Sequence, residues 1–309
     1  MLPFRLVYHE GYSLDAGEHV FPWRKYRLVR QGLIAQGIAQ PDDFTAPAPA
    51  TDDDLARVHD RGWIERMSRG TLSYQEVSRL EIPYSRGMVQ AFRLAAGGTI
   101  LAARLALSDG IGFNVGGGFH HAFAGHGEGF CAFNDVAVAI RCLLSEGAIE
   151  RAMVVDCDVH QGNGTATLFA EDSRVFTLSI HQLNNYPAHK PPSDIDIDLE
   201  DGTGDEDYLD LLLRHYVPAL VEHRPQIVVY LAGADPYYQD ELGGLGLTMG
   251  GLRSRDRFVM ETALRRGASV AVTLAGGYAF QVQDTVAIHI NTVKTSAAAM
   301  AAARSEPRT

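Results

Sequence analysis

Five short apolar runs, rich in β-branched residues and separated by longer helical patterns, constrain the fold of this 309-residue chain more than any other feature. The runs are IGFNVGG at 111–117, RAMVVDCD at 151–158, RVFTLSI at 174–180, QIVVYLAG at 226–233 and SVAVTLAGG at 269–277. Uninterrupted apolar strands of this kind are typical of a parallel sheet that helices cover on both faces. The predicted helices between them are 133–144, 205–222 and 252–266. This alternation predicts an α/β fold built from βαβ units.

No linker divides the chain. The Pro- and Ala-rich stretch TAPAPATDDD at 45–54 is short, and predicted strands continue after it. We therefore predict a single domain over residues 1–309. The Ala-rich segment 295–309 is predicted to be a helix that frays into a C-terminal tail.

Charge and cysteine content narrow the class of protein. Acidic residues outnumber basic ones 38 to 27, and the formal charge of −11 argues against a nucleic-acid partner while favouring a cationic substrate. The three cysteines, Cys131, Cys142 and Cys157, have no CxxC spacing, so we expect neither a disulfide framework nor a thiolate zinc site. No run approaches the roughly 18 apolar residues of a membrane span. We expect a cytoplasmic protein without a membrane partner, and the oligomeric state is left open.

Four of the predicted strands carry unusual polar residues at their carboxyl ends. These ends are NVGGGFHH, VVDCDVH, YLAGADP and TLAGGY. Ligands of open parallel α/β sheets bind in the crevice beyond the carboxyl ends of the strands. The sequence therefore predicts one site to which all four strand ends contribute.

The segment 155–160 has the pattern of a metal site. Asp156, Asp158 and His160 alternate along it, so in extended backbone their side chains point the same way. Asp235 ends another apolar strand, where an unpaired carboxylate would be costly. Asp158, His160 and Asp235 are thus candidate ligands of a divalent ion, zinc foremost, with a position open for water and substrate. The alternative interpretation makes the Asp residues turn or helix caps and His160 a hydrogen-bonded side chain.

Two further strand ends carry groups suited to proton transfer. The adjacent His120 and His121 follow three glycines, and a His pair can supply a general base together with a charged partner. Tyr278 follows a Gly pair and can donate its hydroxyl to a developing oxyanion. Taken singly, a His is more often structural and such a Tyr is more often a packed aromatic.

Taken in order, five motifs resemble the histone deacetylase and acetylpolyamine amidohydrolase superfamily. They are GGGFHHA at 116–122, GEGFCAFND at 127–135, DCDVHQGNGT at 156–165, LAGADP at 231–236 and AGGY at 275–278. The spellings DVHQGNG and DELGGLGLT look most like the class IV branch and its bacterial relatives. The resemblance implies a single arginase-like α/β domain with an eight-stranded, mainly parallel sheet. It also implies a zinc-dependent hydrolase of linear amides that deacylates acyl-lysine, with acetyl or longer acyl groups as substrates.

The same resemblance implies a role for individual residues. The implied zinc ligands are Asp158, His160 and Asp235, and the implied catalytic residues are His120, His121, Tyr278, Asp156 and Asn163. The implied walls of the acyl-lysine tunnel are Gly129, Phe130, Tyr186 and Leu242. Structural potassium is implied at Asp156, Asp158, His160, Ser179 and Ile180, with a second site near Phe169, Asp172 and Val175.

One departure from the family pattern concerns the principal proton shuttle, His121. Asn163 stands where the better-known nuclear enzymes carry a second Asp, and Gln161 stands where they carry a His. Asn163 cannot give His121 a negative charge, which favours the neutral imidazole that a general base needs. Its amide can still orient the ring through a hydrogen bond.

Three alternatives stay open at this point. A binuclear manganese ureohydrolase shares the architecture, but 156–163 supplies too few bridging carboxylates. The substrate can instead be a small acylamine such as an acetylpolyamine. The chain can also be a catalytically silent relative that only binds acylated ligands. The sequence does not distinguish zinc from iron as the metal in the cell.

Overall fold

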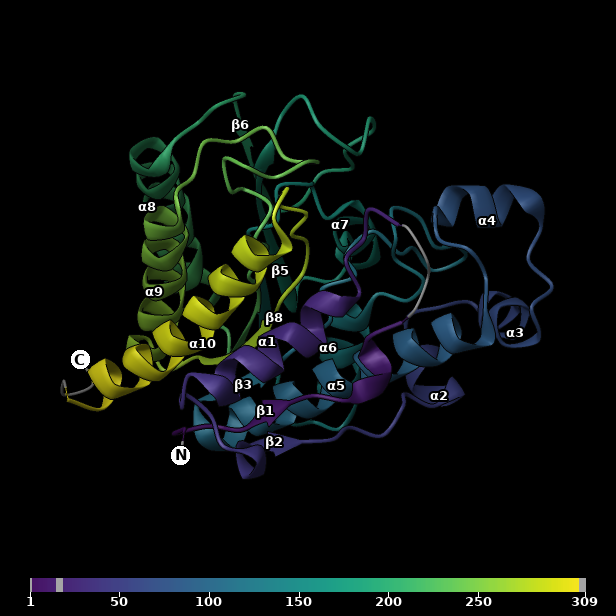
Figure 1. Ribbon diagram of the computed structural model, residues 1–309, viewed down its shortest axis with the longest axis horizontal. Coiled ribbons are helices and arrows are strands. Elements are labelled where there is room, and N and C mark those ends of the chain that lie inside the picture. The colour runs from purple at the N-terminus through teal and green to yellow at the C-terminus, as the bar shows by residue number, and fades with distance from the viewer. Residues whose placement is uncertain (1, 15–18, 306–309) are drawn as a thin grey trace.

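An eight-stranded sheet forms the centre of the protein in a computed structural model that describes residues 2–14 and 19–305 (Figure 1). The strands lie in the order β2-β1-β3-β8-β7-β4-β5-β6, and each neighbouring pair is parallel. They are β1 (Leu6–Val7), β2 (Phe44–Thr45), β3 (Ile111–Asn114), β4 (Ala152–Asp156), β5 (Val175–Gln182), β6 (Ile195–Leu199), β7 (Ile227–Leu231) and β8 (Ser269–Thr273). The predicted α/β class and eight-stranded parallel sheet are confirmed. The assignment of residues 1–309 to a single domain stays a prediction.

The five apolar runs became five consecutive strands of the sheet, in the order β3, β8, β7, β4 and β5. The residue pattern did not reveal the other three. β1 and β2 have only two residues each, too few for a period to show. β6 reads IDIDL, and its Asp residues face solvent at the sheet edge. That alternation is the pattern of a strand with one buried face, unlike the continuous apolar runs of those five strands.

The helices include the three that the sequence predicts. Segments 133–144, 205–222 and 252–266 correspond to α6 (Asp135–Ser145), α8 (Asp205–His223) and α9 (Met249–Arg265). α9 begins earlier than predicted because Thr248 caps it by accepting the N–H of Gly251. The long helices are α1 (Arg24–Ala35), α5 (Arg86–Asp109), α6 (Asp135–Ser145), α8 (Asp205–His223), α9 (Met249–Arg265) and α10 (Val282–Ser305). The shorter ones are α2 (Asp52–Leu55), α3 (Arg61–Arg69), α4 (Tyr74–Leu80), α7 (Asn163–Phe169) and the 3-10 turns Glu10–Tyr12 and Pro41–Asp43.

Two helical layers enclose the sheet. α8, α9 and α10 lie side by side with α1 beyond them, whereas α5 packs against α6, β3 and β8 (Figure 1). α5 is long and apolar enough to cross a membrane, but 67% of its most apolar stretch is buried inside the protein, as in a core helix. α10 continues to Ser305 with Ala299 and Met300 buried. The end of the predicted tail, 306–309, lies outside the described residues.

The strand order places the predicted site residues next to one another. β3, β8, β7 and β4 are consecutive neighbours in the sheet. Because the strands are parallel, their carboxyl ends meet at one edge. The loops that follow them carry His120 and His121, Tyr278, Asp235, and Asp158 with His160, in that order. The sheet topology thus brings four distant chain segments to one crevice.

A buried arginine on α9 ties two of these loops to the helical layer. Arg255 is fully buried, and its guanidinium donates to the carbonyl oxygens of Cys157 and Gly233, at 3.1 and 2.8 Å. It also pairs with Asp256 at 2.8 Å, and Asp256 accepts the hydroxyl of Tyr230 on β7 at 2.6 Å. Cys157 directly precedes Asp158, so Arg255 fixes the backbone from which a candidate ligand projects.

We expect Arg255→Met to lower the free energy of unfolding by about 3–5 kcal/mol, because it leaves the Asp256 carboxylate buried without its charge partner. Chemical denaturation measures this difference. The matched control is Arg214→Met, which removes an exposed partner of Asp210 on α8 and should change stability by less than about 1 kcal/mol. Equal effects of the two substitutions would contradict a structural role for Arg255.

Candidate metal centre and its pocket

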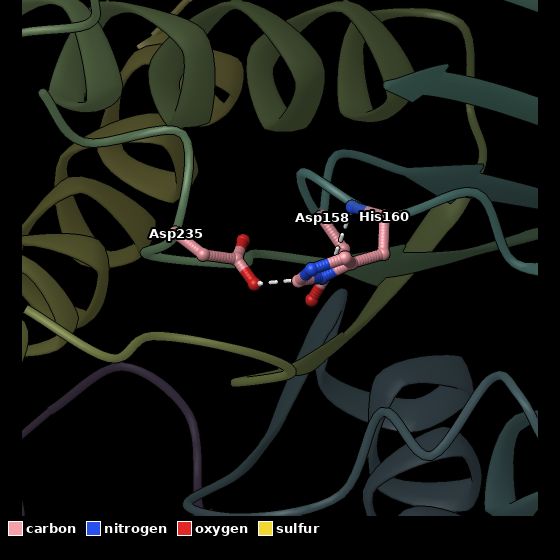
Figure 2. A group of neighbouring side chains, drawn as sticks. All are labelled: Asp158, His160 and Asp235. Atoms are coloured by element: carbon pink, nitrogen blue, oxygen red, sulfur yellow. Dashed lines mark hydrogen bonds and ion pairs between the residues drawn. The ribbon is translucent and has the colours of Figure 1, made fainter. Parts of the chain in front are cut away.

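Asp158, His160 and Asp235 converge at the carboxyl edge of the sheet. Figure 2 shows Asp158 and His160 on one loop and the Asp235 carboxylate pointing towards the His160 ring from another. One potential ligand atom from each residue lies within 4.8 Å of the others, and all three side chains are buried. Nδ1 of His160 is 3.0 Å from Asp158 Oδ1 and 3.6 Å from Asp235 Oδ2. The predicted set of metal ligands is therefore brought together.

Backbone amides hold the two carboxylates in place. Val159 N–H donates to Asp235 Oδ1 at 2.9 Å, and Gly276 N–H donates to Asp158 Oδ2 at 2.7 Å. A Cβ atom on Gly276 would overlap with Asp235 Oδ2, so only glycine allows the backbone to approach this closely. Asp235 Oδ2 accepts no hydrogen bond from the described residues. An oriented, buried carboxylate oxygen without a donor fits a metal ligand.

The electrostatics of the three residues favour a bound cation. Burial and the neighbouring carboxylate of Asp158 raise the pKa of Asp235 to about 6. Burial lowers the pKa of His160, but the carboxylates of Asp158 and Asp235 outweigh burial and raise it to about 10. The two acids thus attract a positive charge into a buried space. Two carboxylates and one imidazole are a donor set that suits zinc and leaves positions open for water and substrate.

The adjacent imidazoles have different partners. Nδ1 of His120 is 2.6 Å from Asp156 Oδ2, whereas Nδ1 of His121 is 2.7 Å from the amide oxygen of Asn163. Burial lowers the pKa of His120, but Asp156 and Asp158 raise it to about 9. Burial and the charges of His120 and His160 lower the pKa of His121 well below its ordinary value. At neutral pH, His120 is therefore charged and His121 is neutral.

Tyr278 completes the group of reactive side chains. Its ring centroid lies 6.4 Å from that of His160. Burial and the charges of Asp158 and Asp235 raise the pKa of its hydroxyl well above the usual value. The hydroxyl therefore stays protonated and can donate a hydrogen bond. The backbone N–H of Tyr278 donates to Asp240 Oδ2 at 2.6 Å, which fixes the position of this residue.

A cavity of about 200 Å³ leads to these groups. The four predicted tunnel residues, Gly129, Phe130, Tyr186 and Leu242, all line it. Phe130 has a φ of +65°, a conformation that a bulky residue rarely adopts and that often marks a functional site. Apolar walls around a few polar groups are typical of small-molecule sites.

The residues predicted to bind potassium form two separate groups. In the first, Asp156 pairs with Ser179 across β4 and β5, and Ile180 follows on β5. In the second, the carbonyls of Phe169 and Asp172 accept the backbone N–H groups of Asp172 and Val175. The Asp172 carboxylate is already held by Arg141 and Arg174. Potassium at either group stays a prediction.

The sequence reasoning missed four residues of this region. Phe21 lines the cavity, and its ring lies 6.0 Å from that of Tyr278. Lys25 is fully buried and donates to the carbonyl of Ala275, two residues after β8. Asp240 holds Tyr278, and Glu128 contacts Asn163. Both acids lie within the quoted motifs DELGGLGLT and GEGFCAFND, so a signal was present. Nothing in the local pattern singled out Phe21 or Lys25.

Comparisons with known proteins agree with this geometry. The family model described as "Histone deacetylase domain" matches residues 19–293. An uncharacterized protein of Picosynechococcus sp. is 41% identical over 93% of this chain and 96% of its own length. Histone deacetylase 2 of Arabidopsis thaliana is 31% identical over 88% of this chain and 74% of its own length. The crystal structure of the HDA15 HD domain has the same fold, with a TM-score of 0.82, 23% identity, and coverage of 95% of this chain and 88% of that one.

We expect Asp235→Asn to have opposite effects on metal binding and on the metal-free protein. Loss of a ligand should weaken zinc binding by more than the roughly 10- to 100-fold typical of an outer partner. In chelator, the variant should melt about 2–4 °C higher, because the repulsion from Asp158 is removed. Zinc titration calorimetry and thermal unfolding measure the two effects. The control is Asp109→Asn at the partly exposed C-terminal end of α5. Zinc binding that survives Asp235→Asn contradicts the ligand assignment.

Proposed function

The chain belongs to the histone deacetylase domain family, and on this premise we propose that it is a zinc-dependent hydrolase that removes acetyl or longer acyl groups from the side-chain nitrogen of lysine. The match to this family confirms the resemblance that the five motifs indicate. Membership of the family supports deacetylase activity on an acetylated protein or small amine. The observation that carries the finer proposal is the buried Asp158, His160 and Asp235 group beside two imidazoles with opposite pKa shifts. Assignment to the class IV branch stays a prediction.

The donor set fits zinc, which when held by Asp158, His160 and Asp235 supplies an activated water at neutral pH and polarises the substrate carbonyl. The protein's own residues do the rest. His121, neutral and facing the cavity, accepts the proton that the attacking water loses. Tyr278, which keeps its proton, donates a hydrogen bond to the carbonyl oxygen as negative charge develops there.

Bond cleavage needs a proton for the leaving amine. Water adds to the carbonyl carbon, the C–N bond breaks, and the proton taken from water is returned to the amine nitrogen, so that a carboxylic acid and a free amine result. His120, held charged by Asp156, keeps positive potential next to the reacting carbonyl throughout. Its charge also disfavours protonation of His121 before the reaction begins, which preserves the base.

The cavity supports an acyl-lysine substrate. Its apolar walls, Phe130, Tyr186 and Leu242, suit an extended alkyl chain, and the net charge of −11 favours a cationic product. Small acylamines such as acetylpolyamines share this chemistry and are the alternative that the assay below separates. Cytoplasmic location, structural potassium, and the lack of a nucleic-acid or membrane partner stay predictions.

The proposal is tested by turnover of fluorogenic acyl-lysine peptides carrying acetyl to myristoyl groups, alongside acetylpolyamines. We expect release that chelator abolishes and added zinc restores, and the series ranks the acyl lengths. Preference for acetylpolyamines over every peptide would move the assignment to small acylamines. Zinc and acyl-lysine binding without hydrolysis would leave a binding protein and overturn the enzymatic proposal.

We expect Tyr278→Phe to lower kcat by roughly 100- to 1000-fold, the usual loss for one oxyanion donor, with zinc content and melting temperature unchanged. The matched control is Tyr238→Phe, which removes a hydroxyl from a side chain that is 55% exposed. Steady-state kinetics with the preferred peptide measures both. Near-normal turnover by Tyr278→Phe would remove Tyr278 from the mechanism.

A further inference from the structure

Asn163 bridges the candidate base and a carboxylate that the mechanism does not use. Its amide oxygen accepts from Nδ1 of His121 at 2.7 Å, and its amide nitrogen donates to Glu128 Oε1 at 2.7 Å. His121 and Asn163 are buried, and the Glu128 side chain is 17% exposed. A chain of two short hydrogen bonds therefore runs from a charged group near the cavity wall to the imidazole.

Glu128 is held as an ionised acceptor. Oε1 accepts from both Asn163 and the hydroxyl of Tyr186, at 2.7 and 2.9 Å, and Oε2 lies 3.1 Å from Nε2 of His126. Burial raises the pKa of Glu128, but the hydrogen bonds from His126, Asn163 and Tyr186 outweigh burial, so this pKa lies below its ordinary value. An ionised carboxylate only accepts hydrogen bonds. The Asn163 side chain can therefore face Glu128 only with its NH2 group.

The direction of the Asn163 amide decides which nitrogen of His121 carries the proton. With NH2 towards Glu128, the amide oxygen faces Nδ1, so His121 is protonated on Nδ1 and has a free lone pair on Nε2. The opposite amide direction would place a donor against Nδ1 and move the ring proton to Nε2. A neutral imidazole with its proton on Nε2 cannot accept a proton there. The amide direction therefore controls whether His121 is a competent base.

We propose that Glu128 is a positioning residue, whose carboxylate fixes the amide of Asn163 and thereby keeps the ring proton of His121 on Nδ1, with Nε2 free to act as the base. This inference rests on the proposed function for the role of Nε2, but the tautomer itself does not depend on turnover. Glu128 also fixes Tyr186 through the same oxygen. It thus links the cavity wall to the base.

Glu128 shares this task with one other group. The backbone N–H of Gly164 donates to the same amide oxygen of Asn163 at 3.0 Å, which also favours the observed amide direction. Loss of Glu128 should therefore give a mixture of the two His121 tautomers and not a complete change from Nδ1–H to Nε2–H. The expected loss of kcat is roughly 10- to 100-fold, the range typical of partners that orient a reactive ligand.

The first test reads the tautomer directly. Long-range 1H–15N spectra of zinc-loaded protein labelled with 15N-histidine distinguish Nδ1–H from Nε2–H, and the His121 signals are those that disappear in His121→Ala. We expect Nδ1–H in the native protein and a mixture in Glu128→Met, which keeps the size but removes both acceptors. Tyr186→Phe, which cuts only the wall-side bond to Glu128, should leave the His121 signals unchanged. Native-like His121 signals in Glu128→Met would overturn the proposal.

The second test uses kinetics and does not depend on the stability of Glu128→Met. Asn163→Asp should lower kcat because two carboxylates then face each other at hydrogen-bond distance. Adding Glu128→Gln should restore kcat about tenfold, since the Gln amide can donate to the introduced carboxylate; contacting residues commonly show coupling of this size. Glu81→Gln is the charge control, because Glu81 lies close enough to interact with Glu128 but makes no hydrogen bond to Asn163.

Each outcome of this series decides the question. Restoration of kcat by Glu128→Gln but not by Glu81→Gln in the Asn163→Asp background supports positioning through Asn163. Equal effects of the two Gln substitutions would mean that only the charge near the cavity matters and would overturn the proposal. If the native protein turned over no acyl substrate at all, the proposed function would fail, and the spectra would still decide on Glu128.

Discussion

The structure depends on one electrostatic constraint, which is that the carboxylates of Asp158 and Asp235 lie close together in a buried space. Two unpaired acids there would be very costly. The surroundings reduce that cost with amide donors from Val159 and Gly276 and with the imidazole of His160. The site is thus preorganised for a cation, and a divalent metal is the ion that satisfies two carboxylates and one imidazole together.

The surrounding scaffold also positions these two carboxylates. Arg255 lies on α9, yet it holds the carbonyl oxygens of residues that neighbour the two acids in sequence, namely Cys157 and Gly233. Gly276 must lack a side chain because its backbone packs directly against both carboxylates. The rigid parallel sheet supplies the third element, since it fixes the starting points of all four loops. Fold and site are therefore not separable: the core helices position the backbone that carries the charges.

The adjacent His120 and His121 show how small differences in partner produce different chemistry. His120 contacts a carboxylate directly and is charged, whereas His121 contacts an amide and is neutral. Asn163 in place of Asp therefore separates the roles of two chemically identical side chains. The negative charge of Glu128 is separated from the His121 ring by the Asn163 side chain. From there, it orients the amide through a hydrogen bond to Asn163 while leaving the imidazole uncharged.

The sequence by itself determined the five apolar strands β3, β4, β5, β7 and β8, three of the long helices and the residues that converge on the centre. Continuous apolar runs, period-two ligands such as Asp158 and His160, and polar strand ends are local patterns that fix which side chains face the same edge. The tertiary structure alone decided the short strands β1 and β2, the buried positions of Phe21 and Lys25, and the contacts of Asp240 and Glu128. These depend on contacts between residues far apart in the chain, such as Lys25 with Ala275 and Glu128 with Asn163. A local pattern records neither such a pairing nor the direction of an amide, because both are set by the atoms that folding brings into contact.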